Sequence, residues 1–213
     1  MTDTLIGVID MDMGNLRSVL NAVHSLGFDH KVVRAEADID GLSHLILPGV
    51  GNYRTAMQHL EAQKLIEPIR AFARTKRPVL GICLGMQLLS FTGDEGGTGA
   101  GVSLIEGHVE RFDPMRVPTI PHVGWNEVRL TRKHPVLTKV KSGVDFYFVH
   151  SYHFRVDDPK DALGLVEYGG GEHSDYVAIV ARDNVLGFQF HPEKSQNNGL
   201  KLLENFCDWD GAC

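Results

Sequence analysis

The chain of 213 residues carries 27 acidic and 21 basic side chains, and its formal net charge of −6 argues against a nucleic-acid surface. Its apolar content of 43% and charged content of 23% are ordinary for a soluble protein with a sizeable core, and no apolar run reaches the ~18 residues of a membrane span. Three scattered cysteines exclude a disulfide framework, so we predict a reducing cytoplasmic setting with neither metal nor cofactor.

Strands and helices alternate through the first half of the chain. Apolar runs predict strands over residues 5–9, 31–33, 44–47 and 78–82, and helical spacing predicts helices over residues 16–23, 56–60 and 65–74. This alternation is typical of a parallel sheet covered by helices on both faces.

The second half of the chain is richer in strand patterns, for example over residues 127–130 and 176–180, and ends in a predicted helix over residues 200–206. Residues 93–101 indicate a loop. The sequence therefore predicts one α/β domain over residues 1–213, with a mixed, mostly parallel central sheet flanked by helices and with added antiparallel strands.

A cysteine between two glycines is the strongest functional signal. The segment Gly81-Ile82-Cys83-Leu84-Gly85 follows an apolar strand and precedes a helical run over residues 86–89. A sharp turn from strand to helix needs small residues two positions before and after the turning residue, as in the nucleophile elbow, here with cysteine in place of serine. We expect Cys83 to present its sulfur to solvent at the carboxyl end of the sheet, although a buried core cysteine is the alternative.

A base and an orienting carboxylate follow a predicted strand over residues 185–190. His191 and Glu193, separated by a proline, are the residue types that a cysteine nucleophile needs for these two roles. The alternatives are an ordinary loop and a zinc deaminase site, but the latter requires a Cys-x-x-Cys pair that the sequence lacks. The sequence favours a triad of Cys83, His191 and Glu193 over zinc ligation.

These segments together resemble a known family. Gly81-Ile82-Cys83-Leu84-Gly85-Met86-Gln87 and Gln189-Phe190-His191-Pro192-Glu193 are similar to motifs of the class I (triad) glutamine amidotransferases. Three further segments are similar to one branch of this family, the glutaminase subunits of imidazole glycerol phosphate synthases in histidine biosynthesis. They are Gly14-Asn15-Leu16-Arg17-Ser18-Val19, Pro121-His122-Val123-Gly124-Trp125-Asn126 and Phe146-Tyr147-Phe148-Val149-His150-Ser151-Tyr152. The resemblance runs from Ile6 to Phe206. It implies a flavodoxin-like fold and hydrolysis of glutamine to glutamate and ammonia through a thioester on the cysteine.

The oxyanion of such a reaction needs two hydrogen-bond donors. The residue after the nucleophile, Leu84, supplies one through its backbone N–H. By resemblance the second comes from the loop in which Val50 lies between Gly49 and Gly51, although a plain tight turn also fits these residues. Because glycine tolerates unusual φ and ψ, we expect this loop to be able to reorient a peptide and so to switch activity.

The resemblance also assigns substrate contacts. Gln87 lies one helical turn after Cys83 on the same face, and by resemblance it helps to hold the glutamine. Glu95 resembles the residue that pairs with the substrate α-amino group, although an ordinary surface glutamate is equally consistent. The backbone of the segment His150, Ser151 and Tyr152 is expected to line the glutamine pocket.

A partner protein is implied, because the sequence contains no site that would use the ammonia. In the family it is a synthase subunit, a (β/α)8 barrel, through which ammonia passes. The residues that resemble its interface are Asn15, Trp125, Tyr147 and Lys194. Trp and Tyr are common interface anchors, although core packing is the alternative for both.

Three other functions stay open. Residues 11–13, 153–154 and 169–174 depart from the expected pattern near the docking face, which leaves room for a paralogue that feeds ammonia to a sugar-modifying synthase in surface polysaccharide assembly. A free-standing cysteine hydrolase of γ-glutamyl bonds would use the same triad. An inactive scaffold subunit, the third alternative, would not need this triad. We favour the subunit of the histidine pathway.

Overall fold

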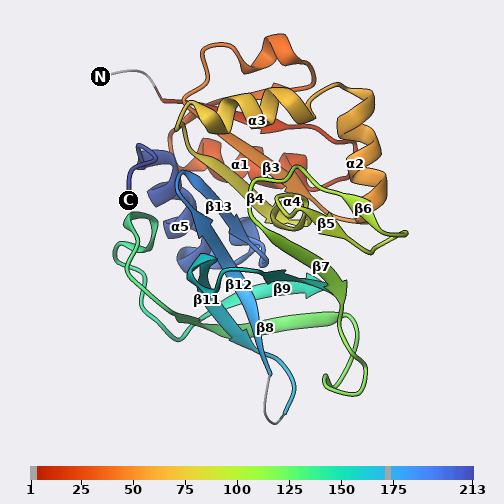
Figure 1. Ribbon diagram of the computed structural model, residues 1–213. Coiled ribbons are helices and arrows are strands. Elements are labelled where there is room, and N and C mark those ends of the chain that lie inside the picture. Colours follow the sequence, from red (N-terminus) through yellow and green to blue (C-terminus); the bar gives the residue numbers. More distant parts are fainter. Residues whose placement is uncertain (1–3, 171–173) are drawn as a thin grey trace.

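A nine-stranded sheet forms the centre of the structure, in the order β2-β1-β3-β4-β13-β12-β11-β8-β9 (Figure 1). The computed structural model describes residues 4–170 and 174–213. Five strands at one side pair in parallel: β2 (Asp29–Val33), β1 (Leu5–Ile9), β3 (His44–Gly49), β4 (Val79–Cys83) and β13 (Val185–Phe188). The other four pair antiparallel: β12 (Asp175–Arg182), β11 (Ala162–Glu167), β8 (His122–Leu130) and β9 (Val144–His150). The prediction of a mixed α/β sheet with added antiparallel strands is confirmed, and the antiparallel part is as extensive as the parallel part.

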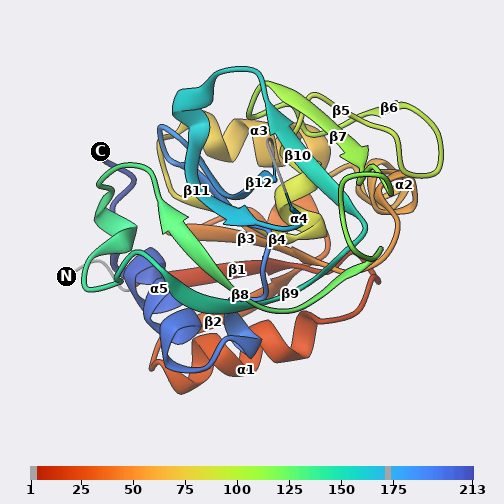
Figure 2. The same cartoon turned by 90° about the horizontal axis from the view of Figure 1, so that it is seen from below.

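Helices cover both faces of the parallel half. Figure 2 shows α1 (Leu16–Ser25) and α5 (Gln196–Asp208) below the sheet, and α3 (Ile66–Arg74) and α4 (Leu84–Leu88) above it. The remaining helix, α2 (Tyr53–Ala62), contacts α4. In α1 the apolar side chains of Val19, Ala22 and Val23 recur at helical spacing and are buried, so they direct the helix onto the sheet. A separate apolar cluster lies on each face.

A second sheet of four strands was not predicted. Its order is β10 (Tyr152–Val156), β7 (Gly107–Arg111), β5 (Thr92–Gly93) and β6 (Gly99–Ala100). The segment 93–101, predicted as a loop, contains β6 and the end of β5, and these two short strands pair with each other. Strands of two residues carry too little hydrophobic alternation to be detected, since the period-2 pattern needs about four to eight residues. Among the described residues, no helix is both long and apolar enough to cross a membrane.

The carboxyl ends of the parallel strands bring distant segments to one edge of the sheet. β1, β3, β4 and β13 end at residues 9, 49, 83 and 188, so the loops that follow them meet there. Ligands bind in open α/β sheets at this edge, outside the carboxyl ends of the strands. The edge therefore gathers the predicted oxyanion loop, the cysteine elbow and the histidine segment.

Candidate active site

Cys83 occupies a strained turn between β4 and α4. Its backbone has φ 53° and ψ −108°, a conformation that residues other than glycine rarely adopt. A Cβ on Gly81 would lie 2.5 Å from the carbonyl oxygen of Gly85, and a Cβ on Gly85 would overlap the carbonyl of Leu47. Both glycines are therefore required for the turn, as the sequence predicts for a nucleophile elbow.

The sulfur faces a cavity of about 360 Å³ and not open solvent, which corrects the sequence expectation. Only 5% of Cys83 is exposed, and its sulfur lies 3.8 Å from the carbonyl oxygen of Val149 in β9. The predicted substrate residues line this cavity together: Gln87, Glu95, His150, Ser151 and Tyr152. So do Val50, Gly51 and Leu84 of the predicted oxyanion site, whereas Gly49 pairs with Cys83 in the neighbouring strand.

His191 and Glu193 form a buried ion pair beside the elbow. Nδ1 of His191 lies 2.8 Å from Oε1 of Glu193, and both side chains are inaccessible to solvent. Pro192 begins the 3₁₀ turn that places the two residues on the same side. The backbone N–H of His191 donates to the carbonyl oxygen of Tyr147 at 2.9 Å, which ties this turn to β9. The ring is thus oriented with Nε2 free of the carboxylate.

The charge state of the pair is set by its neighbours. Burial disfavours a charged ring, but the nearby Cys83 and the hydrogen bond to Glu193 outweigh it and raise the pKa of His191 to about 9. Burial likewise opposes ionisation of Glu193, yet His191 and Asn15 lower the pKa of its carboxyl. Cys83 is close enough to act on the ring, but Nε2 of His191 has no hydrogen-bond partner among the described residues. The pair is therefore an imidazolium and a carboxylate at neutral pH.

The comparison with known sequences decides the family. The family model of "Glutamine amidotransferase class-I" matches residues 7–209. The chain belongs to the class-I glutamine amidotransferase family. Imidazole glycerol phosphate synthase subunit HisH of Sulfurimonas denitrificans is 43% identical over 205 residues, which cover 95% of this chain and 97% of that protein. The same subunit of Symbiobacterium thermophilum is 44% identical over 93% of this chain and 91% of its own length.

Solved structures support the fold of this amidotransferase. The crystal structure of a glutamine amidotransferase aligns with a TM-score of 0.74 at 20% identity and covers 97% of this chain and 99% of its own. The structure of PurLQS from Thermotoga maritima aligns with a TM-score of 0.75 at 17% identity, over 97% and 98% of the two chains. The predicted glutamine amidotransferase fold is confirmed.

Asn15 of this amidotransferase contacts the triad, a role that the sequence did not reveal. Its Nδ2 donates to Oε1 of Glu193 at 2.8 Å, whereas Oε2 of that carboxylate is buried without a partner among the described residues. Asn15 has φ 66° at the start of α1, in the left-handed region that asparagine tolerates better than most residues. The glycine directly before it, Gly14, was the available sequence signal of an unusual loop, and its φ is 69°.

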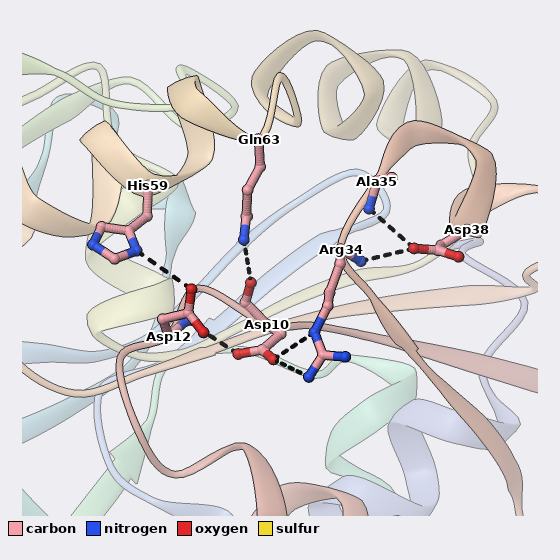
Figure 3. A network of polar contacts seen from close by, with 7 residues as sticks. All are labelled: Asp10, Asp12, Arg34, Ala35, Asp38, His59 and Gln63. Carbon is pink, nitrogen blue, oxygen red and sulfur yellow. Dashed lines mark hydrogen bonds and ion pairs between the residues drawn. The ribbon is translucent and has the colours of Figure 1, made fainter.

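The loop that carries Asn15 is anchored at its base by polar contacts around Asp10 (Figure 3). The guanidinium of Arg34 donates two bonds to Oδ2 of Asp10, at 2.8 and 3.0 Å, and the N–H of Asp12 donates to Oδ1 at 3.0 Å. Nε2 of Gln63 donates to the carbonyl oxygen of Asp10 at 2.9 Å. The contacts fix the start of residues 10–15 against β2 and the end of α2.

The predicted oxyanion donors differ in how they are used. Leu84 is the first residue of α4, where a helix leaves its N–H groups without intrahelical partners. The N–H of Val50 instead donates to the carbonyl oxygen of Met13 at 3.3 Å. Gly51 has φ 112°, so the residue after Val50 already uses the freedom of glycine.

The substrate side of the cavity holds two buried amides. Nε2 of Gln87 donates to the carbonyl oxygen of Tyr152 at 2.9 Å and to Oε1 of Gln189 at 3.0 Å. Gln189 contacts the sulfur of Cys83, a position that sequence reasoning missed, although a lone polar residue in an apolar strand was a usable signal. Opposite them, Oε2 of Glu95 accepts from the N–H of Tyr53 at 2.8 Å, and burial raises the pKa of Glu95.

The predicted interface residues other than Asn15 lie at or near the surface. Trp125 in β8 is 46% exposed and its ring lies 5.8 Å from that of Tyr147 in the paired strand β9. Lys194 is exposed in the turn after Glu193. Within the described ranges, no three His, Cys, Asp or Glu side chains converge as ligands of a metal ion would.

Proposed function

We propose that this amidotransferase hydrolyses glutamine to glutamate and ammonia, with Cys83 as nucleophile, His191 as acid and base, and Glu193 as the group that orients the ring. The observation that carries the proposal is the placement of a cysteine at a strained elbow, facing a cavity and next to a buried imidazolium–carboxylate pair. A cysteine nucleophile needs an adjacent base that is oriented by a third group, and the buried His191–Glu193 pair supplies both beside Cys83.

In the first half of the reaction the Cys83 thiolate attacks the side-chain carbonyl carbon of glutamine. The C–S bond forms, the carbonyl electron pair moves to oxygen, and the oxyanion accepts hydrogen bonds from backbone N–H groups. His191 then donates its proton to the departing nitrogen as the C–N bond breaks. Ammonia leaves, and a glutamyl thioester remains on Cys83.

In the second half His191, now neutral, takes a proton from water as the water oxygen attacks the thioester. The C–S bond breaks, glutamate leaves, and the thiolate–imidazolium pair is restored. Glu193 keeps Nδ1 protonated throughout, so that Nε2 is the atom that exchanges protons. The net reaction is glutamine and water to glutamate and ammonia.

Substrate binding is assigned to the cavity walls. We propose that Glu95 pairs with the α-amino group, that Gln87 helps to hold the ligand, and that residues 150–152 present their backbone to it. The location of all five residues around one cavity next to Cys83 supports this assignment.

We further propose that residues 1–213 act as one amidotransferase domain that delivers ammonia to a (β/α)8-barrel synthase subunit of imidazole glycerol phosphate synthase, in the cytoplasm. The relatives above, named as HisH subunits of that synthase, support the histidine pathway over the sugar-modifying paralogue. An exposed apolar pair on β8, Val123 and Trp125, supports a docking face that includes Tyr147 and Lys194. Of the segments that depart from the pattern, 169–174 lies partly outside the described residues.

Replacement of Cys83 by alanine tests the proposal in the complex with the barrel synthase. We expect glutamine-dependent turnover to be lost and turnover with added ammonium to be retained, because only the ammonia source is removed. An unchanged glutamine-dependent rate would refute the proposed triad. Strong glutamine hydrolysis by the chain alone, with no synthase that accepts its ammonia, would favour a free-standing hydrolase.

A further inference from the structure

Gln189 is a polar side chain without any exposed surface, placed next to the reacting sulfur. Its backbone N–H donates to the carbonyl oxygen of Ala178 at 2.9 Å, so the residue continues the pairing of β13 with β12 and is held rigidly. Its Nε2 lies 3.8 Å from Sγ of Cys83, within reach of a hydrogen bond to sulfur. Burial of an amide costs free energy unless it is hydrogen-bonded, so the contacts of this side chain define its role.

The orientation of the Gln189 amide is forced by a backbone carbonyl that can only accept. The carbonyl oxygen of Tyr152 accepts from Nε2 of Gln87 at 2.9 Å and from Nδ1 of His150 at 2.8 Å. Gln87 must therefore turn its NH₂ group toward Tyr152 and Gln189. Because that group donates, the atom of Gln189 that accepts from it at 3.0 Å must be Oε1. Its own NH₂ group is then the one that faces the sulfur.

The sulfur thus lies between one donor and one acceptor. Sγ of Cys83 is 3.8 Å from Nε2 of Gln189 and 3.8 Å from the carbonyl oxygen of Val149. A thiol can satisfy both contacts, whereas a thiolate can use only the amide donor. Nε2 of His191 is not hydrogen-bonded to the sulfur, so the amide of Gln189 is the side-chain donor that contacts it among the described residues.

We propose that Gln189 is a further catalytic residue, whose amide N–H stabilises the thiolate of Cys83, and that Gln87 orients this amide through its contact with Tyr152. The inference rests on the proposed glutaminase function and deepens it. A hydrogen bond to a charged group is stronger than one to a neutral group, so the amide favours the thiolate over the thiol.

Other titratable groups surround the same space, and the test must separate their effects. His191 acts on the sulfur with Glu193 behind it, and Glu95 and His150 line the cavity. Burial lowers the pKa of His150 to about 3, so its ring is neutral and its tautomer stays fixed by Tyr152. None of these four groups is changed by substitution of Gln189.

Two substitutions of similar size test the proposal in the complex with the barrel synthase. Gln189→Met removes both the donor to the sulfur and the acceptor for Gln87, whereas Gln189→Glu keeps the acceptor for Gln87 and replaces the donor with a second oxygen. We expect the kcat for glutamine to fall by about ten- to a hundredfold in Gln189→Met, the range that a charged hydrogen bond implies, with KM changed by less than about threefold. The kcat should fall further in Gln189→Glu, because a carboxylate repels the thiolate.

Alkylation of Cys83 by iodoacetamide supplies a readout that a purely structural role would not move. Peptide mapping by mass spectrometry separates Cys83 from the exposed Cys213, which serves as an internal reference. We expect the pH profile of Cys83 alkylation to shift upward in Gln189→Met, further upward in Gln189→Glu, and that of Cys213 to stay unchanged. Asn184→Ala is the matched control, because it removes two side-chain hydrogen bonds that run from the turn between β12 and β13 to the carbonyl oxygens of Ala73 and Arg77.

An upward shift of the pH profile of Cys83 alkylation in the Gln189 variants, but not in Asn184→Ala, supports the proposal. An unmoved alkylation profile and an unchanged kcat in Gln189→Met would overturn it while leaving the glutaminase function intact. Equal shifts in all three variants would also overturn it, because destabilisation alone would then explain the effect. A wild-type complex without glutamine-dependent turnover would instead refute the proposed function itself.

Discussion

The N–H of Val50 donates a hydrogen bond to the carbonyl oxygen of Met13. The contact joins the loop after β3 to the loop after β1. It occupies the Val50 N–H, which is the proposed second oxyanion donor beside the N–H of Leu84. With this bond in place the proposed site has one of its two oxyanion donors. Residues 10–15 therefore contact both Glu193, through Asn15, and the proposed oxyanion loop, through Met13.

The isolated chain is expected to hydrolyse glutamine slowly. Loss of one oxyanion donor typically lowers the rate by about 10²- to 10³-fold, so binding of the synthase should raise kcat by a factor of that order if it turns the Val50 peptide. Steady-state glutamine hydrolysis with and without the synthase measures this. Equal rates for the chain and the complex would contradict the prediction.

Removal of the Asn15 side chain should weaken catalysis more than substrate binding. Asn15→Gly keeps the left-handed backbone accessible but deletes the donor to Glu193, so the carboxylate holds the imidazolium less well. A charged hydrogen bond of about 1.5–3 kcal/mol predicts a tenfold or greater loss in kcat. Isothermal titration with the synthase checks that the variant still docks, and a normal kcat would show that the contact is not used.

The titration of His191 should depend on Cys83. Because the pKa of His191 is raised from 6.5 to about 9, its protonation stabilises the fold fully below pH 6.5, and this contribution is lost as the pH rises through about 9. The shift corresponds to at most about 3 kcal/mol of unfolding free energy. NMR of the ring should give a midpoint near 9 in the wild type and a lower one in Cys83→Ala. Identical midpoints would mean that the sulfur does not act on the ring.

The ionisation of Glu193 changes the stability of the fold with pH in the opposite direction. The pKa of its carboxyl is lowered, so its contribution is present above pH 4.5 and is lost as the pH falls below that value. Glu193→Gln should abolish this part of the acid dependence of the urea midpoint and also reduce the elevation of the His191 pKa. An acid dependence equal to that of the wild type would count against the buried ion pair.

A methyl group on Gly85 should prevent the elbow from forming. Its Cβ would overlap the backbone carbonyl of Leu47, which cannot move aside as a side chain can, so Gly85→Ala should lose about 3 kcal/mol of stability or more. Gly99→Ala is the matched control, because the nearest atom to its Cβ would be 3.9 Å away. Urea unfolding compares the two variants. Equal midpoints would exclude the close approach.

Truncation of Trp125 should weaken docking without unfolding the chain. Large aromatic anchors often contribute 2 kcal/mol or more to an interface, so Trp125→Ala should raise the Kd for the synthase by roughly thirtyfold. Phe91→Ala, which removes another exposed aromatic ring outside β8 and β9, is expected to leave Kd unchanged. Isothermal titration measures both, and equal effects would argue that β8 is not the docking face.

The sequence by itself determined the elements and the reactive groups. Apolar periodicity is local, so the strands and helices of the parallel half were predicted close to their observed bounds, and Gly81 and Gly85 marked the elbow because the steric demand of such a turn acts within a few residues. The same locality explains the pairing of His191 with Glu193, which are separated by only one proline.

Only the tertiary structure decided the contacts between segments far apart in the chain. Asn15 meets Glu193, Val50 meets Met13 and Gln189 meets Cys83 because parallel strands end at one edge of the sheet, and no local pattern encodes which loops become neighbours there. The burial of Cys83 has the same origin, since β9 contacts its sulfur through Val149 and the segment after β9 lines the cavity. Local sterics and periodicity are written in neighbouring residues, whereas burial and hydrogen-bond partners depend on how the whole chain packs.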